Sequence, residues 1–273
     1  LPILSFAEIS ENHRNAIILI GSRPYADEII HQFLIDGFAS DHIVFEEFAG
    51  YAAMVRLDIS ALLQKNSEKI QRVQALLSDK SSQDVLYGYL NYLQTFDAAY
   101  IQQIKSPEIM YFDGSLFRLS KHETVVDGGG YIGDTFSVFA QLAQSFDTYF
   151  LCEPISENMQ KARTKLNGMK FSGCVRYFET ALWDCDTSLN FDEHGAASSV
   201  QPMGITGAAS PLDDLVEEKN VTMIKLDVEG SENKALLGAR KTITRCRPKL
   251  AVCVYHYNNT VEHGSFDILD LPL

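Results

Sequence analysis

The first fifty residues follow a strand, helix and strand pattern. The apolar runs "AIILIGS" and "HIVFEEF" are strand-sized, and "PYADEIIHQFLIDG" lies between them. Within that segment Ile29, Ile30 and Phe33 recur at helical spacing. Gly37 lies where a helix would end, and from residue 57 to residue 104 the pattern is helical. This part of the chain therefore predicts an α/β unit followed by a helical connector.

Beyond residue 111, strand-sized apolar runs alternate with helical patterns. This alternation predicts a parallel sheet with right-handed crossovers, whose ligands lie beyond the carboxyl ends of the strands. We therefore predict two domains, residues 1–110 and residues 111–273. Strands are predicted at "ETVVDGGG", "TYFLCEP", "VRYFETALW", "TMIKLDVEG" and "KLAVCVYHY", and helices at "IGDTFSVFAQLAQS", "SENMQKARTKL" with Ser156 as its N-cap, and "SENKALLGARKTITR".

The segment "VVDGGGYIGDTF" places three consecutive glycines between a strand and a helix. Glycines let the backbone turn sharply and let a ligand approach closely, while the helix start offers N–H groups and partial positive charge. Glu153 follows Gly133 by 20 residues, ends the next predicted strand, and can accept hydrogen bonds from ribose hydroxyls. Together these features predict a site for a nucleotide-like cofactor, although a turn that binds no ligand is the structural alternative.

Two cofactors fit this turn. Gly128, Gly130 and Gly133 have the G-x-G-x-x-G spacing of a dinucleotide site. Asp127 favours another ligand, because a carboxylate beside the turn would repel a pyrophosphate but could hold an ammonium group. The residues therefore favour S-adenosylmethionine, which has one ribose and an amino acid tail, over a nicotinamide dinucleotide, which stays open.

Charged residues in "IKLDVEGSE" are the main candidates for chemistry. Lys225, Asp227 and Glu229 alternate, so a strand would place all three on one face. Charges inside a buried strand are costly unless they are paired or solvated. Either Lys225 forms an ion pair with one of the two acids and stiffens the strand, or the carboxylates face the cofactor and an acceptor hydroxyl.

His256 follows the next predicted strand and would emerge at the same edge of the sheet. Its near-neutral pKa as a free side chain suits a general base, so Asp227, Glu229 and His256 are the candidate bases for removing a hydroxyl proton. No cluster indicates a dedicated metal site, although these three side chains together could hold a metal ion. Asp213 and Asp214, in "PLDDL", are more typical of a helix N-terminal cap than of catalysis.

Composition excludes some partners. The net charge of −13, from 23 basic and 36 acidic residues, opposes nucleic acid phosphates and anionic membrane surfaces. No apolar run approaches the roughly 18 residues of a membrane span. Five cysteines without a CxxC pair predict reduced core residues of a cytoplasmic protein. We expect no nucleic acid and no membrane partner, and leave a homodimer open.

Five motifs of the second region occur between Glu123 and Leu273: "VVDGGGYIGDTF", "CEPISENMQKARTKL", "SPLDDL", "IKLDVEGSENKALLGARKTITRCRPKLAVCVYH" and "FDILDLPL". In sequence and in order they resemble the FkbM-type S-adenosylmethionine-dependent methyltransferases. The "KLDVEGSE … GA … RPKLAV … YH" run is far more distinctive than the glycine turn. The resemblance implies a class I methyltransferase fold, a Rossmann-like doubly wound sheet, and O-methylation of a sugar, glycan or natural-product hydroxyl.

The resemblance also implies positions for the cofactor. Asp127 and the glycines would hold its methionine part, Glu153 its ribose, and residues 180–182 its adenine. Trp183, the only tryptophan, either covers that ring or belongs to the core. The implied catalytic residues are Lys225, Asp227, Glu229 and His256, and the implied cofactor contacts are Asp127, Gly129, Gly130, Tyr131, Gly133, Glu153, Pro154, Thr180, Ala181 and Leu182.

Both ends of the chain depart from this pattern. "IILIGSRPYADEIIHQFLIDGF" has the rhythm of a nucleotide-binding unit, but its turn after Gly21 is glycine-poor. We predict a Rossmann-like accessory domain that supports substrate binding or dimerisation. A nucleotide-sugar site with Arg23 at a phosphate is the alternative. Class I methyltransferases add two strands after the "YH" strand, whereas this sequence stops at "DLPL", so either those strands are missing or the sheet is incomplete.

Overall fold

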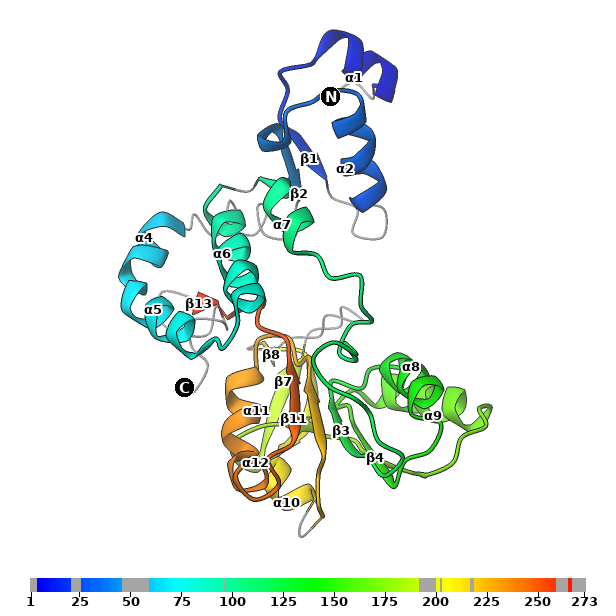
Figure 1. The fold of residues 1–273 in the computed structure, drawn as a ribbon. Helices are drawn as coiled ribbons and strands as arrows, with labels where there is room; N and C mark the ends of the chain where they lie inside the picture. The colour runs from blue at the N-terminus through cyan, green and yellow to red at the C-terminus, as the bar shows by residue number, and fades with distance from the viewer. Residues whose placement is uncertain are drawn as a thin grey trace. The chain divides into compact units, whose positions relative to one another are not determined.

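The computed structural model describes residues 4–20, 26–45, 59–95, 97–191, 200–201, 203–216, 219–258 and 265–266. The chain divides into two compact units, Leu1–Pro107 and Glu108–Leu273, and Figure 1 labels many of their elements. Among the helices of the described residues, none has the length and apolarity that a membrane crossing needs.

The first unit contains two parallel strands with a helix between them in sequence. β1 (Ile18–Ile20) pairs with β2 (Ile43–Phe45), and α2 (Ala26–Ile35) lies between. Gly37 follows α2 with a φ of +88°, a left-handed conformation that suits glycine after a helix. The predicted order of elements is therefore present, while the accessory role stays a prediction and the turn with Arg23 lies outside the described residues. The other elements of this unit are α1 (Phe6–Asn12), η2 (Ser40–His42), α4 (Ile59–Lys65), α5 (Ser67–Leu76), α6 (Lys80–Thr95) and α7 (Ala98–Ile104).

The second unit contains a parallel five-stranded sheet with the order β11-β10-β3-β4-β5. The chain runs outward from β3 through β4 to β5, then returns to the other side of β3 to form β10 and β11. The order of the strands therefore reverses between β3 and β10. The strands are β3 (Thr124–Gly128), β4 (Thr148–Cys152), β5 (Cys174–Phe178), β10 (Met223–Leu226) and β11 (Lys249–Val252).

Helices cover both faces of this sheet, and each face has its own core (Figure 1). Side chains of β3 alternate between the two cores: Val125 packs with α8 (Asp134–Ala143) and α9 (Ser156–Asn167), whereas Val126 packs with α10 (Leu212–Val216), α11 (Glu232–Gly238) and α12 (Arg240–Cys246). Apolar side chains on both faces explain why the central strands read as continuous hydrophobic runs.

Several elements differ from the prediction. β10 ends at Leu226, so Asp227 and Glu229 lie beyond the strand and do not alternate within it. The last predicted helix breaks at Ala239 into α11 and α12. Ser156 is the first residue of α9 and not its N-cap.

Asp213 caps a helix, as predicted, but the helix is α12 and not its own. Its carboxylate accepts hydrogen bonds from the backbone N–H groups of Lys241 at 3.0 Å and Thr242 at 2.7 Å. These two amides lie in the first turn of α12, where N–H groups lack partners within the helix.

A second, four-stranded sheet follows β5 and was not predicted. The predicted strand "VRYFETALW" is two strands in the structure, β5 and β6 (Ala181–Leu182), and β6 pairs with β9 (Ile205–Ser210). The order is β6-β9-β7-β8, with β7 (Thr187–Phe191) and β8 (Val200–Gln201). β12 (Tyr257–Asn258) and β13 (Ser265–Phe266) form a separate antiparallel pair.

The cysteines are all free, but only part of the expectation about them holds. Cys152 and Cys253 are buried, as core residues should be. Cys174 and Cys185 are exposed, because they lie at the start of β5 and in the turn before β7.

Candidate active site

The candidate site lies where the strand order reverses. The carboxyl ends of β3 and β10 meet there, and in doubly wound sheets this reversal opens a crevice for ligands. The backbone joins the two strand ends directly, because Asp227 N donates to Gly128 O at 3.1 Å. The glycine turn and the "KLDVEGSE" segment therefore lie side by side.

The amides of the glycine turn are used inside the protein. Gly129 N and Gly130 N both donate to Cys152 O, at 3.1 and 2.9 Å, and Gly133 N donates to Gly130 O at 2.8 Å. These three groups hold the shape of the turn. A ligand at the turn would have to use other donors.

Gly129 is required by both its conformation and its surroundings. Its φ is +74°, and a Cβ at this position would lie 2.0 Å from the carbonyl oxygen of Asp227. No side chain fits in that space, because the neighbouring atom belongs to the backbone. The absence of a Cβ therefore lets the turn after β3 approach the end of β10.

Asp127 is fully buried and has two partners within the protein. Its Oδ2 accepts a hydrogen bond from the Tyr149 hydroxyl at 2.7 Å. Its Oδ1 lies 2.9 Å from Lys225 Nζ, a contact based on charge attraction and not on well-aligned hydrogen-bond geometry. Burial raises the pKa of Asp127, and the nearby Lys225 charge opposes that rise. Contact of this carboxylate with a cofactor stays a prediction.

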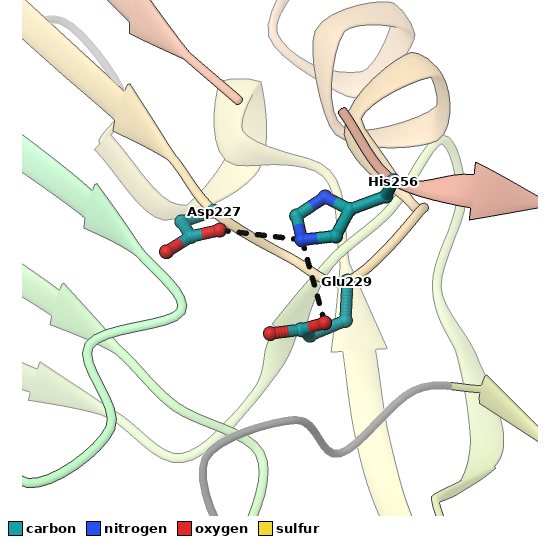
Figure 2. A group of neighbouring side chains, drawn as sticks. All are labelled: Asp227, Glu229 and His256. Atoms are coloured by element: carbon teal, nitrogen blue, oxygen red, sulfur yellow. Dashed lines mark ion pairs between the residues drawn. The ribbon is translucent and has the colours of Figure 1, made fainter. Parts of the chain in front are cut away.

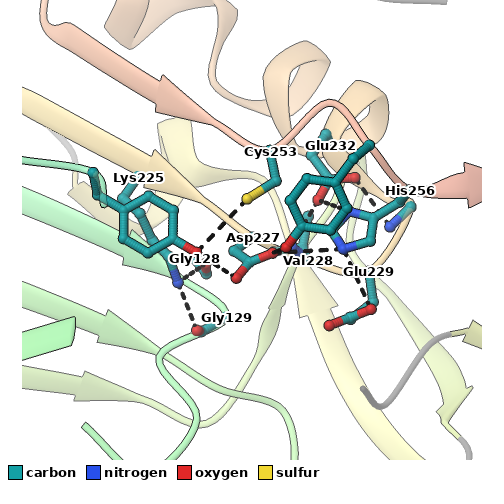
Figure 3. A network of polar contacts seen from close by, with 12 residues as sticks. Gly128, Gly129, Lys225, Asp227, Val228, Glu229, Glu232, Cys253 and His256 are labelled. Carbon is teal, nitrogen blue, oxygen red and sulfur yellow. Dashed lines mark hydrogen bonds and ion pairs between the residues drawn. The ribbon is translucent and has the colours of Figure 1, made fainter. Parts of the chain in front are cut away.

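Lys225 forms the ion pair that the sequence suggested, but with a different partner. It pairs with Asp127 on the neighbouring strand and not with Asp227 or Glu229. Lys225 Nζ also donates to Gly129 O at 2.8 Å (Figure 3). Burial lowers the pKa of Lys225, but attraction to Asp127 and Asp227 outweighs that effect and raises it. Lys225 is therefore a buried ammonium that links the two strands.

Glu153 lies beside the glycine turn, at the end of β4. Its Oε2 accepts from Tyr131 N at 3.0 Å, and its Oε1 accepts from Ile155 N at 3.0 Å and from Asn158 Nδ2 at 3.3 Å. Burial raises its pKa, while these hydrogen bonds act in the opposite direction. A carboxylate oxygen can accept two hydrogen bonds, so Oε2 has capacity for one more donor.

Asp227, Glu229 and His256 point toward one another at the rim of the sheet (Figure 2). His256 Nε2 lies 3.6 Å from Asp227 Oδ1 and 3.4 Å from Glu229 Oε2. Glu229 reaches this position through a left-handed turn, with a φ of +54°. The structure therefore brings together the three candidate bases predicted from the sequence.

A carboxylate behind the rim holds both His256 and the turn. Glu232 is fully buried, and its Oε1 lies 3.0 Å from His256 Nδ1. The same carboxylate accepts from Val228 N at 2.8 Å and Gly230 N at 3.0 Å (Figure 3). Because Nδ1 faces Glu232, Nε2 is the ring nitrogen that faces the other two acids.

Tyr111 holds Asp227 from the other side. Its hydroxyl donates to Asp227 Oδ2 at 2.7 Å, and Lys225 Nζ lies 5.3 Å from the centre of its ring. Tyr255 also donates to Asp227 Oδ1, at 3.4 Å. Burial raises the pKa of Asp227, but the Lys225 charge and the Tyr111 hydrogen bond outweigh it, so the pKa is lowered. For His256, burial lowers the pKa, but Glu232 and the rim acids outweigh it and the pKa is raised.

This chain is similar to a known protein family and to a solved structure. The family model of the methyltransferase FkbM domain matches residues 127–271, more than half of the 273 residues. The chain belongs to the FkbM methyltransferase family. The crystal structure of the methyltransferase FkbM from Methylobacillus flagellatus KT is 24% identical, with a TM-score of 0.68 over 94% of this chain and 68% of that one. No curated protein matches the chain.

These findings confirm the family and the fold class. At this identity the solved structure shows the fold alone, an α/β architecture with a mostly parallel central sheet. The family match shows that residues 127–271 form a methyltransferase domain. The roles of individual residues in this FkbM methyltransferase stay predictions.

The residues expected near an adenine follow β5 in this FkbM domain. Thr180 is buried, and Leu182 is a core residue whose side chain packs against Gly128. Ala181 pairs with β9, and Pro154 packs against Gly207 of the same strand. Trp183 is half-buried, with Lys234 Nζ 5.6 Å from its ring centre, so it is not a fully buried core residue.

Two residues of the FkbM site were missed by sequence reasoning. Tyr111 lies 116 positions from Asp227, and nothing in the local pattern "MYFDG" connects it to a strand end. Glu232 was read only as part of a helix. Its position three residues after Glu229 placed it near the rim, but no sequence signal distinguished a buried carboxylate from a solvated helical one.

Proposed function

We propose that this chain is an S-adenosylmethionine-dependent O-methyltransferase whose acceptor is a hydroxyl of a sugar, glycan or other natural product. The observation that supports this most strongly is the strand reversal. It places the glycine turn and the rim of Asp227, Glu229 and His256 next to each other at the carboxyl ends of β3 and β10. A cofactor and an acceptor bound there would be neighbours.

The residues at the turn fit S-adenosylmethionine. Glu153 Oε2 can accept one more hydrogen bond, as a ribose hydroxyl requires, and is fixed by Tyr131 N. The rim carries an excess of acids, which suits a cationic ligand. Lys225 pairs with Asp127 and also attracts Asp227, while His256 lies beside Asp227, Glu229 and Glu232. When bound, S-adenosylmethionine supplies a methyl group activated by a sulfonium.

The rim residues would orient the acceptor and take up its proton. An acceptor hydroxyl hydrogen-bonded to this cluster passes its proton to one of the three side chains as its oxygen bonds the methyl carbon. The bond between that carbon and sulfur breaks, and its electron pair stays on sulfur. Methyl transfer mainly needs the acceptor oxygen to lie in line with the bond from sulfur to the methyl carbon. Tyr111 and Glu232 hold Asp227 and His256 in place, so these two side chains can orient the acceptor.

Two other functions compete with this proposal. A nicotinamide-dependent oxidoreductase would need donors for a pyrophosphate, and the amides of Gly129, Gly130 and Gly133, which are used within the turn, serve neither a pyrophosphate nor the carboxylate of S-adenosylmethionine. The match to a methyltransferase family disfavours an oxidoreductase. A protein that binds the cofactor without turnover would keep the fold. This non-catalytic alternative predicts that substitutions of Glu229 and His256 leave biological activity intact.

Calorimetry with S-adenosylhomocysteine and with NAD tests the cofactor. We expect S-adenosylhomocysteine to bind and NAD not to bind. Glu153→Gln should weaken the affinity for S-adenosylhomocysteine by about 10–100-fold, because a hydrogen bond to a charged group contributes about 1.5–3 kcal/mol. Glu157→Gln, an exposed residue on α9, is the matched control and should bind normally. Binding of NAD alone would end the proposal, and unchanged affinity in Glu153→Gln would remove Glu153 from the site.

The acceptor is tested separately with labelled S-adenosylmethionine. Sugars, nucleotide sugars and hydroxylated natural products are incubated with the full chain, and methyl ethers are sought among the products. Transfer of label to a hydroxyl oxygen supports O-methylation. Transfer to nitrogen or carbon alone would contradict it.

A further inference from the structure

Three potential ligand atoms converge at the rim with the spacing of a cation site. One ligand atom from each of Asp227, Glu229 and His256 lies within 4.8 Å of the others. Ligands about 2.1 Å from one cation lie roughly 3.0–3.4 Å apart in octahedral or tetrahedral geometry. The distances from His256 Nε2, 3.6 Å to Asp227 and 3.4 Å to Glu229, are close to that spacing.

Two of the three side chains also have an outer partner that fixes their orientation. Glu232 holds His256 Nδ1 at 3.0 Å and so directs Nε2 toward the rim. Tyr111 holds Asp227 Oδ2 at 2.7 Å and leaves Oδ1 directed at His256. A carboxylate behind the histidine and a hydrogen bond to the coordinating carboxylate are the outer arrangement that metal sites use.

The charge and burial of the cluster call for a cation. The side chains of Asp227, Glu229 and His256 are 23%, 27% and 10% exposed, and Glu232 behind them is fully buried. Lys225 is paired with Asp127 and also attracts Asp227, so its single charge is shared between two carboxylates. Carboxylates that gather at a half-buried position are stabilised by a divalent cation at their centre.

We propose that Asp227, Glu229 and His256 bind a divalent first-row cation such as Mn²⁺ or Zn²⁺, which in turn binds two neighbouring oxygens of the acceptor. Three protein ligands leave coordination positions open for a substrate. The acceptor class then narrows to vicinal diols and hydroxy acids, which chelate through adjacent oxygens. This second part rests on the proposed function, whereas the cation site does not.

The cation would promote the same transfer step. A hydroxyl bound to a divalent cation loses its proton more easily. That proton passes to the carboxylate oxygen of Glu229 that does not hold the cation, and then to water. The acceptor oxygen forms its bond to the methyl carbon, the electron pair of the broken bond stays on sulfur, and the cation is unchanged.

Mn²⁺ titration of the full chain tests the site directly. The protein is stripped with EDTA, and free Mn²⁺ is measured by electron paramagnetic resonance with and without S-adenosylhomocysteine. We expect one saturable site that Zn²⁺ competes for. Tyr111→Phe should weaken the affinity by about 10–100-fold, the usual effect of losing an outer partner, and Asp227→Asn or Glu229→Gln should weaken it more. Asp147→Asn, from the exposed His122–Asp147 pair, is the control and should bind normally.

Several outcomes separate the two proposals. Absence of saturable Mn²⁺ and Zn²⁺ binding, or unchanged affinity in folded Asp227→Asn and Glu229→Gln, overturns the cation site. Full methyl transfer in EDTA overturns it as well and leaves the proposed function standing. Saturable Mn²⁺ binding without any binding of S-adenosylhomocysteine supports the site and overturns the proposed function. Unfolding followed by Trp183 fluorescence confirms that each variant is folded.

Discussion

Lys225→Met should strongly destabilise the second unit, because it leaves a buried charge without its partner. The side chains of Lys225 and Asp127 are only 3% and 0% exposed, and Nζ lies 2.9 Å from Oδ1. Removing one partner of a buried pair costs about 3–5 kcal/mol. The carbonyls of Gly128 and Gly129 also lose a donor, at 3.2 and 2.8 Å. We therefore expect the free energy of unfolding to fall by about 3–5 kcal/mol.

Urea unfolding followed by tryptophan fluorescence measures this change in the right unit. Trp183 is the only tryptophan and lies in the second unit, so its signal reports that unit alone. Lys161→Met is the matched control. Lys161 forms an exposed pair with Glu157 on α9, and exposed pairs contribute little. Its unfolding midpoint should remain close to that of the wild type.

The double variant decides whether the buried charge is the cause. Asp127→Asn keeps an acceptor for the Tyr149 hydroxyl but removes the charge. If the reasoning is right, Lys225→Met combined with Asp127→Asn is more stable than Lys225→Met alone. A loss below about 1 kcal/mol in Lys225→Met, or a double variant no more stable than it, would refute the reasoning.

Three further predictions concern the same unit. Gly129→Ala should lower the unfolding free energy by more than about 2 kcal/mol, since a left-handed alanine costs about 1–2 kcal/mol before the backbone clash is counted. Gly114→Ala is the control and should be neutral, because no atom lies within 4 Å of the added Cβ. Equal losses of unfolding free energy in the two variants would contradict this prediction. Asp213→Ala should cost about 1 kcal/mol by uncapping α12, so an unchanged midpoint would exclude the cap. The pKa of Glu123 is lowered, because Lys249 and other hydrogen bonds outweigh its burial. Its stabilisation should therefore be fully present above its unfolded pKa of about 4.3 and vanish as the pH falls through the lower folded value. The difference in unfolding free energy between the wild type and Glu123→Gln should shrink in acid, and growth there would contradict the assignment.

The central sheet was predictable because its strands carry an unambiguous signal. The strand with Val125 and Val126 and the strand "TYFLC" place apolar side chains on both faces of the sheet. Each is followed by a glycine or a polar residue. The small sheet of β6 to β9 was not predictable, because β9 reads "ITGAAS", which has no period of two and only one large apolar side chain, Ile205. Its pairing depends on contacts with β7 that no local pattern reveals.

The candidate site was partly predictable for a related reason. Asp227, Glu229 and His256 follow strands, and parallel strands bring their carboxyl ends to one edge, so sequence position alone places them together. Their outer partners depend on tertiary structure. The pairing of Lys225 with Asp127 follows from the register of β10 against β3, which the sequence does not state. Tyr111 arrives from before the first strand of the sheet.

The carboxylate of Glu232 has a mechanical consequence. By bonding Val228 N, Gly230 N and the ring of His256 at once, it fastens the turn after β10 to the segment after β11. A ligand that displaced the turn would therefore also displace the imidazole, and a replacement of Glu232 would loosen the turn after β10 and the segment after β11 together.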